Sequence, residues 1–146
     1  MKEVKDFYDT LRENLQNFRG KYDSYIDYGP ELFKLLVDLL GEEKVDSEGR
    51  KLINAALAYY IAPKDVIPEE IYGPFGYVDD IFVCIYVIKL LEKKFGYDLL
   101  VEYWDGESEL KAVVDECYEK SKEVVKDEID EILKYVGLKW RKDLSN

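Results

Sequence analysis

Five carboxylates gather in one turn-rich stretch in the middle of the chain, residues 59–81. They are Asp65, Glu69, Glu70, Asp79 and Asp80. Three of the four prolines fall in the same stretch, so we expect the chain to turn there. Carboxylate oxygens are the ligands that Mg²⁺ and Ca²⁺ prefer in proteins. A cation site in this turn, with metal-assisted hydrolysis as one use of it, would draw on Asp65, Asp79, Asp80 and Glu69.

The same carboxylates have a structural interpretation, and the helix-end pattern favours it. Asp65 follows Pro63 by two residues and can accept hydrogen bonds from backbone N–H groups ahead of it. Asp79 and Asp80 fall in the opening turn of a predicted helix, where each negative charge stabilises the helix dipole by about 0.3–1 kcal/mol. We therefore expect helix caps rather than metal ligands, and we predict no catalytic or cofactor-binding residue.

The tyrosines around this turn are also expected to be structural. Tyr59, Tyr60, Tyr72 and Tyr77 bracket it. We expect them to pack through the ring while the hydroxyl reaches a backbone group. A partner-facing patch of aromatic anchors is the alternative.

The residue inventory excludes several classes of enzyme. The chain has no histidine, which excludes Ser-His-Asp and Cys-His catalysis. Its two cysteines are too few for a Cys₄ zinc site. Cys84 lies in an apolar run and Cys117 in an amphipathic helix, so both are predicted to be reduced and buried. A protein without catalytic activity is the favoured prediction.

The elements that must position these residues are nearly all helical. Apolar residues recur with the 3.6-residue period, which predicts an all-α fold of about six helices in a single domain, residues 1–146. Pro30 suits a helix start, Asp46 or Ser47 suits an N-cap, and Gly41 and Gly96 suit the position after a helix. The expected helices are 3–18, 30–40, 47–61, 77–94, 98–104 and a long amphipathic helix, 107–136. Gly137 follows the last of these, and residues 138–146 are predicted to be a polar tail.

Charge and hydropathy restrict the partners. The net charge is −11 and only three residues are arginine, so the overall field opposes nucleic acid. The longest apolar run, residues 81–88, is too short to span a bilayer. The first residues lack the apolar core of a signal peptide. We therefore expect a cytoplasmic protein with no transmembrane segment.

The central turn resembles a known family. The motif reads Tyr60-x-x-Pro63-x-Asp65-x-Ile67-Pro68, followed by Gly76-Tyr77-x-Asp79-Asp80. It is similar to the YkvA-like domain of unknown function (DUF1232), over about residues 50–92. Glu69 stands where that family usually has Asp, and the stretch between Pro68 and Gly76 is one residue longer than usual. The resemblance implies a compact helical domain built on this hairpin, in proteins of which some are membrane-associated, and it implies no established activity.

Two functional hypotheses follow from these patterns. The first is a non-catalytic module for protein interaction or self-association, with a protein partner or a homo-oligomer. The alternative is a divalent-cation-binding protein or a metal-dependent hydrolase, with Mg²⁺ or Ca²⁺ in the acidic turn.

Overall fold

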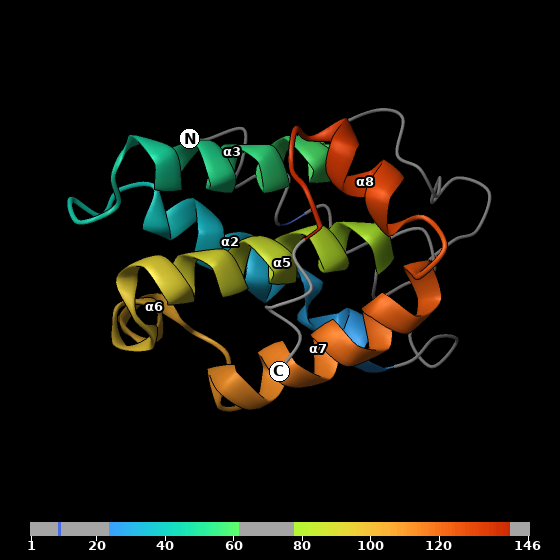
Figure 1. Cartoon of the computed structure of the whole chain (residues 1–146). Coiled ribbons are helices and arrows are strands. Elements are labelled where there is room, and N and C mark those ends of the chain that lie inside the picture. The colour runs from blue at the N-terminus through green and yellow to red at the C-terminus, as the bar shows by residue number, and fades with distance from the viewer. Residues whose placement is uncertain (1–8, 10–23, 62–77, 141–146) are drawn as a thin grey trace.

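Helices make up the fold that the sequence predicts to be all-α. The computed structural model describes residues 9, 24–61 and 78–140, and these contain helices but no strand. The predicted helix 3–18, apart from residue 9, and most of the central turn lie outside the described residues. The elements, shown in Figure 1, are the 3₁₀-helix η1 (Ser24–Tyr28), α2 (Gly29–Leu39), α3 (Ser47–Ile61), α5 (Val78–Phe95), α6 (Tyr97–Tyr103), α7 (Leu110–Val125) and α8 (Ile129–Tyr135).

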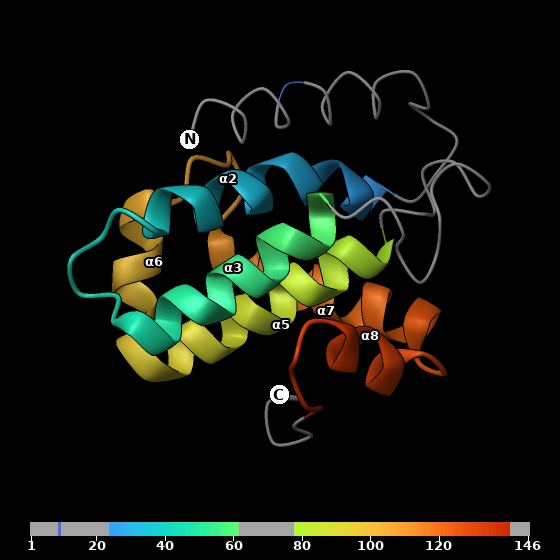
Figure 2. The same cartoon turned by 90° about the horizontal axis from the view of Figure 1, so that it is seen from above.

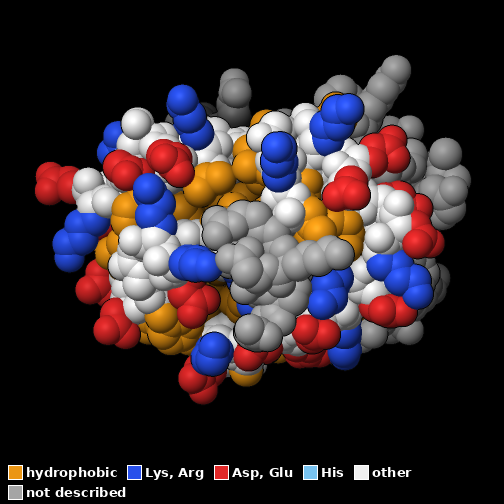
Figure 3. All heavy atoms as spheres, viewed as in Figure 1, with side chains coloured by type: hydrophobic (Ala, Val, Ile, Leu, Met, Phe, Trp, Pro, Cys, Tyr) orange, Lys and Arg blue, Asp and Glu red, His pale blue; other side chains and the backbone are white. Residues whose placement is uncertain are grey.

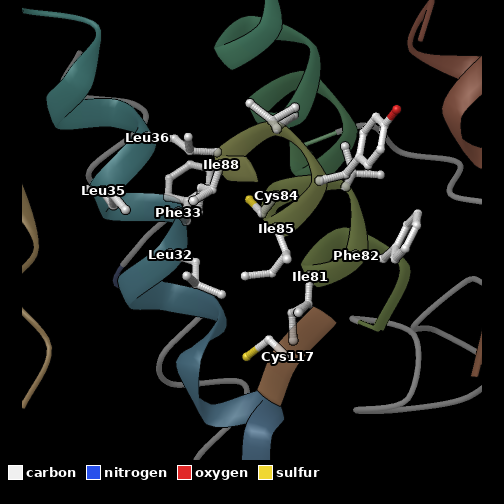
Figure 4. Close-up of a cluster of buried hydrophobic side chains, with 14 of the residues drawn as sticks. Leu32, Phe33, Leu35, Leu36, Ile81, Phe82, Cys84, Ile85, Ile88 and Cys117 are labelled. Carbon is white, nitrogen blue, oxygen red and sulfur yellow. The ribbon is translucent and has the colours of Figure 1, made fainter. Parts of the chain in front are cut away.

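Helix α5 is the centre of the packing. Every residue from Val78 to Lys89 is buried, which explains why its sequence is apolar around most of its circumference. Helices α2, α3, α6, α7 and α8 all contact it, and Figures 1 and 2 show them arranged around its length. Figure 4 shows the core between α2 and α5, where Leu32 and Phe33 face Ile85 and Ile88.

The start of α3 confirms a predicted cap. Asp46 Oδ1 accepts a hydrogen bond from the backbone N–H of Gly49 at 2.8 Å, and the Asp46 carbonyl accepts from Arg50 N–H. This bond to Gly49 and the neighbouring Lys94 ammonium lower the pKa of the Asp46 carboxyl. Glycine fits at position 49 because a Cβ there would lie 2.8 Å from the Val45 side chain and 2.9 Å from the Phe95 ring. Pro30 lies in the first turn of α2, as predicted.

Two of the predicted helix-ending glycines have a positive φ, which residues with a Cβ rarely adopt. Gly96 has φ +92° and Gly137 has φ +80°. After Gly137, the Leu138 N–H reaches back to the Leu133 carbonyl at 2.7 Å, the bond that closes a helix C-terminus. Gly41 follows the end of α2 but keeps a negative φ, because short turns back to Asp38 continue the right-handed coil.

The prediction of one long helix over residues 107–136 is wrong. The chain forms α7, then a turn at Lys126–Glu128, then α8. Helix α8 folds back to bury Ile132 and Leu133, and its Tyr135 ring meets the Tyr59 ring edge-on at 5.6 Å. Burial of these side chains against the rest of the fold outweighs the few backbone hydrogen bonds lost at the turn.

The segment after α8 also packs on the fold. The Trp140 ring lies 5.9 Å from Phe82, 5.6 Å from Tyr86 and 6.4 Å from Tyr118, measured between ring centroids. The Tyr86 hydroxyl donates to the Lys139 carbonyl. Residues 138–140 therefore contact α5 and α7 rather than extend as a polar tail, and residues 141–146 lie outside the described part.

Two lysines border this aromatic cluster. The Lys89 Nζ lies 4.5 Å from the centre of the Tyr118 ring, and the Lys122 Nζ lies 5.0 Å from it. Lys89 is only 8% exposed, so its ammonium sits over the ring with little water around it. Such cation–π contacts are stronger when desolvated. They help explain how a buried helix face accommodates a lysine.

Candidate functional site

Asp79 and Asp80 occupy the first turn of α5, where the sequence places them. Both side chains are 0% exposed. Buried carboxylates are rare because removing a charge from water costs several kcal/mol unless bonds compensate it. The acidic start of α5 is therefore an interior feature of the fold, not an exposed acidic turn.

The carboxylate of Asp79 joins two helices. Its Oδ2 accepts a hydrogen bond from the Tyr59 hydroxyl of α3 at 2.5 Å, and its Oδ1 accepts from the Asp80 backbone N–H at 3.1 Å. The second bond satisfies one of the N–H groups at the helix start that have no partner within the helix. Asp79 thus accepts one bond from its own helix start and a second from α3, and the second has no signal in the sequence.

Tyr60, the next residue on α3, holds a third helix. Its hydroxyl donates to the Gly29 carbonyl at the start of α2, 3.2 Å away. A Cβ on Gly29 would lie 3.2 Å from that hydroxyl, so glycine allows the close approach. The Phe33 ring packs edge-on against Tyr60 at 5.2 Å. The expectation that tyrosine hydroxyls reach backbone groups is confirmed for Tyr60, whereas Tyr59 bonds a side chain.

The environment of this cluster keeps the Tyr60 hydroxyl and the Cys84 thiol protonated. Burial raises the pKa of the Tyr60 hydroxyl well above its usual value, and the nearby Cys84 and the Asp80 carboxylate raise it further. Burial also raises the pKa of the Cys84 thiol, with the Asp80 charge as the next cause, while a hydrogen bond with Tyr60 acts in the opposite direction. A thiol with a raised pKa is a poor nucleophile.

Both cysteines are buried and free, as predicted. Burial is the main reason why the pKa of the Cys117 thiol rises to about 12, and Glu116 adds to the effect. The Cys117 thiol lies 3.8 Å from the Tyr25 carbonyl, within reach of a weak S–H hydrogen bond. Each cysteine therefore acts as a small core side chain.

The predicted cation ligands are only partly placed by the structure. Asp79 and Asp80 are neighbours on α5, whereas Asp65 and Glu69 lie outside the described residues. Within residues 24–61 and 78–140, no three His, Cys, Asp or Glu side chains form a group suited to a metal ion. What the described part of the site does chemically is bind three helices together through hydroxyl groups and a carboxylate.

A hollow of about 520 Å³ lies elsewhere on the surface, and no sequence pattern indicates it. It is lined by Asp27, Tyr28, Glu31, Lys34, Asp105, Gly106, Glu107 and Ser108. The Lys34 ammonium pairs with Asp105 and Asp38, and hydrogen bonds to both carboxylates raise the pKa of this lysine. These groups are partly exposed, so the ion pairs contribute little to stability.

Fold and site together define a class: an all-α protein in which the acidic start of a central helix is buried against a tyrosine-bearing helix. The chain belongs to the family described as "Protein of unknown function (DUF1232)", whose model matches residues 50–86. That match runs from the first turn of α3 to the middle of α5, so it contains both partners of the Tyr59–Asp79 bond. The expected family resemblance is confirmed.

A relative extends the likeness beyond that hairpin. The chain is similar to "Uncharacterized protein ORF9" of Methanothermobacter thermautotrophicus, with 35% identity over 128 residues, 88% of each chain. No solved structure matches the chain significantly. In the part of the chain that the structure describes, no helix is both long and apolar enough to cross a membrane.

Proposed function

We propose that this protein acts without catalysis, by associating with further copies of itself or with a protein partner. The observation that carries the proposal is the position of two of the three large apolar side chains that are exposed among the described residues. Val124 of α7 is 52% exposed and Tyr135 of α8 is 55% exposed. These two residues belong to the two helices that flank one turn. Contiguous exposed apolar patches mark contact surfaces, and we assign Val124 and Tyr135 to such a surface.

The buried polar groups of the segment that matches the family model, residues 50–86, support the same proposal. Asp79, Tyr59 and Tyr60 are almost completely buried and bonded within the fold. Because these groups are buried, they stabilise the fold and do not contact a partner. A partner would therefore be recognised by side chains at the surface. Figure 3 shows hydrophobic side chains in separate areas of the face presented in Figure 1, among Lys, Arg, Asp and Glu side chains.

The net charge makes self-association sensitive to salt. Each copy carries a formal charge of −11, so two copies repel one another at a distance. Salt screens that repulsion and leaves the apolar contact unaffected. Association through an apolar surface should therefore strengthen as ionic strength rises, whereas an interface built on ion pairs would weaken.

Sedimentation velocity on the full chain, from low to high micromolar concentration, tests the proposal. A sedimentation coefficient that rises with concentration and with salt supports it. The Val124→Ser variant should associate more weakly than the wild type. The Val101→Ser variant is the matched control, because Val101 is 43% exposed on α6, away from the α7–α8 turn. Equal association of the two variants would contradict the assignment of this surface, and a monomer at every concentration would contradict self-association.

A divalent-cation site is the second candidate, because one observation favours it. Asp79 and Asp80 are consecutive carboxylates, and both are fully buried. A cation would offset their mutual repulsion. Asp65 and Glu69 would supply the further oxygen ligands that Mg²⁺ or Ca²⁺ requires.

Thermal unfolding with Mg²⁺, Mn²⁺ or Ca²⁺, compared with a chelator, tests this second candidate. A bound ion stabilises the folded state by mass action, so the midpoint should rise with metal concentration. The Asp80→Asn variant should lose that rise. An unchanged midpoint at millimolar metal would exclude a cation site that contributes to folding.

A further inference from the structure

The turn between α7 and α8 lacks the residues that normally end a helix. Residues 110–136 contain neither glycine nor proline. The turn itself is Lys-Asp-Glu, and Lys126 keeps a right-handed helical backbone with φ −51° and ψ −33°. No residue in the turn therefore prevents the chain from continuing as one helix.

The apolar stripe also continues across the turn. Ser121 and Val125 are buried on α7, and Ile129 and Ile132 are buried on α8. Their spacing is four, four and three residues, which is the spacing of one face of a continuous helix. The same sequence is therefore compatible with two conformations, a helix that folds back at the turn and a helix that runs straight through it.

A straight helix would need a new cover for α8. Ile132 and Leu133 are 0% exposed in the folded-back form, and the segment that follows places Trp140 on Tyr86 and Phe82. In the straight form these side chains leave the α5 surface of their own chain. The surface that matches them is the same α5 surface on a second copy, because it can accept the same side chains in the same positions.

We propose that two copies of this chain form a dimer by exchanging α8 and the segment through Trp140, with Lys126–Glu128 as the hinge. This inference rests on the proposed self-association and specifies its interface. Exchange of an identical element is a low-cost route to a dimer, because the α8 of each chain packs on its partner as it would pack on its own chain. Only the hinge changes conformation, and it changes from a turn into helix.

The exchange also gives a role to the exposed Val124. This side chain lies two residues before Lys126, so in the straight form it is part of the hinge helix. The two hinge helices of an exchanged dimer are related by a two-fold axis and meet near that axis. Val124 is then placed at a contact that exists only in the dimer.

Two opposite changes in hinge length test the exchange. Deletion of Lys126–Glu128 removes the turn that α8 needs to fold back, while the loss of three residues, nearly one helical turn, keeps the apolar stripe close to its register. This variant should be a dimer at all concentrations. Insertion of Gly-Gly-Ser after Asp127 lengthens the turn and interrupts a straight helix, so this variant should be a monomer. Light scattering coupled to size-exclusion chromatography gives both masses, and circular dichroism confirms that both variants are folded.

Subunit mixing of the wild type provides an independent test. Native mass spectrometry follows the mixing of unlabelled and ¹⁵N-labelled dimers. Exchanged dimers mix only when α8 undocks, so mixing should be slow and should accelerate in mild denaturant. Rapid mixing of wild-type dimers would overturn the exchange but not self-association. A dimer mass for the Gly-Gly-Ser insertion variant would do the same. A wild-type chain that is monomeric throughout would overturn both, and this test holds even if the deletion variant does not fold.

Discussion

Loss of the hydrogen bond between Tyr59 and Asp79 should measurably lower the free energy of unfolding. The Tyr59→Phe substitution removes only the hydroxyl that lies 2.5 Å from Asp79 Oδ2. The ring that packs edge-on against Tyr135 remains in place. Hydrogen bonds to charged groups contribute about 1.5–3 kcal/mol, and a buried acceptor left without its donor costs a similar amount. We therefore expect the free energy of unfolding to fall by about 2–3 kcal/mol.

The Tyr60→Phe substitution is a matched control. It removes a hydroxyl from the neighbouring residue of the same helix, and both side chains are at most 2% exposed. The hydroxyl of Tyr60 donates to a neutral backbone carbonyl at the longer distance of 3.2 Å. A neutral bond of this kind contributes about 0.5–1.5 kcal/mol. The control should therefore lose less stability than Tyr59→Phe.

Urea unfolding at neutral pH measures both variants against the wild type. The linear extrapolation gives the free energy of unfolding, and an unchanged slope shows that both variants unfold over the same surface area. If Tyr59→Phe lowers the free energy of unfolding by no more than Tyr60→Phe does, the buried Asp79 carboxylate is not stabilised by the Tyr59 hydroxyl. That result would refute the structural role assigned to the start of α5.

Three further predictions concern the helix ends and the thiols. Gly137→Ala should lower the unfolding free energy by about 1–2 kcal/mol because alanine disfavours φ +80°, while Gly41→Ala, at negative φ, should be neutral or stabilising; urea unfolding compares the two. The folded Asp46 carboxyl has a lowered pKa, so its contribution to the free energy of unfolding is present above the ordinary value of 3.8 and is lost as pH falls. The stability advantage of the wild type over Asp46→Asn should therefore shrink below that pH. An advantage that does not change with pH would contradict the capping assignment. Burial and raised pKa values should keep Cys84 and Cys117 unreactive toward an aromatic disulfide reagent at pH 8 until denaturant is added; labelling of the native protein would contradict their burial.

Local sequence signals predict the helices well where an end has its own chemistry. Asp46 caps α3 because its side chain reaches an N–H three residues ahead, a relation contained in a few adjacent residues. Gly96 and Gly137 end helices because a residue without Cβ adopts positive φ readily. Such features can be predicted from a single sequence because they involve no residue that is distant along the chain.

Tertiary contacts explain what the sequence could not predict. The break between α7 and α8 has no local signal, since the apolar stripe continues through it and the folded-back form depends on Leu133 and Trp140 meeting distant helices. The bond from Tyr59 to Asp79 crosses 20 residues and has no periodicity that would reveal it. The sequence predicts that Asp79 opens a helix, but the tyrosine that stabilises it is found only in three dimensions.

The mass of the full-length chain in solution tests the central claim most directly. The monomer has a mass of 17.2 kDa. Static light scattering at increasing protein concentration and moderate salt should give a weight-average mass that rises toward twice this value. A mass that stays at 17.2 kDa over the whole concentration range would contradict self-association and, with it, the exchange of α8.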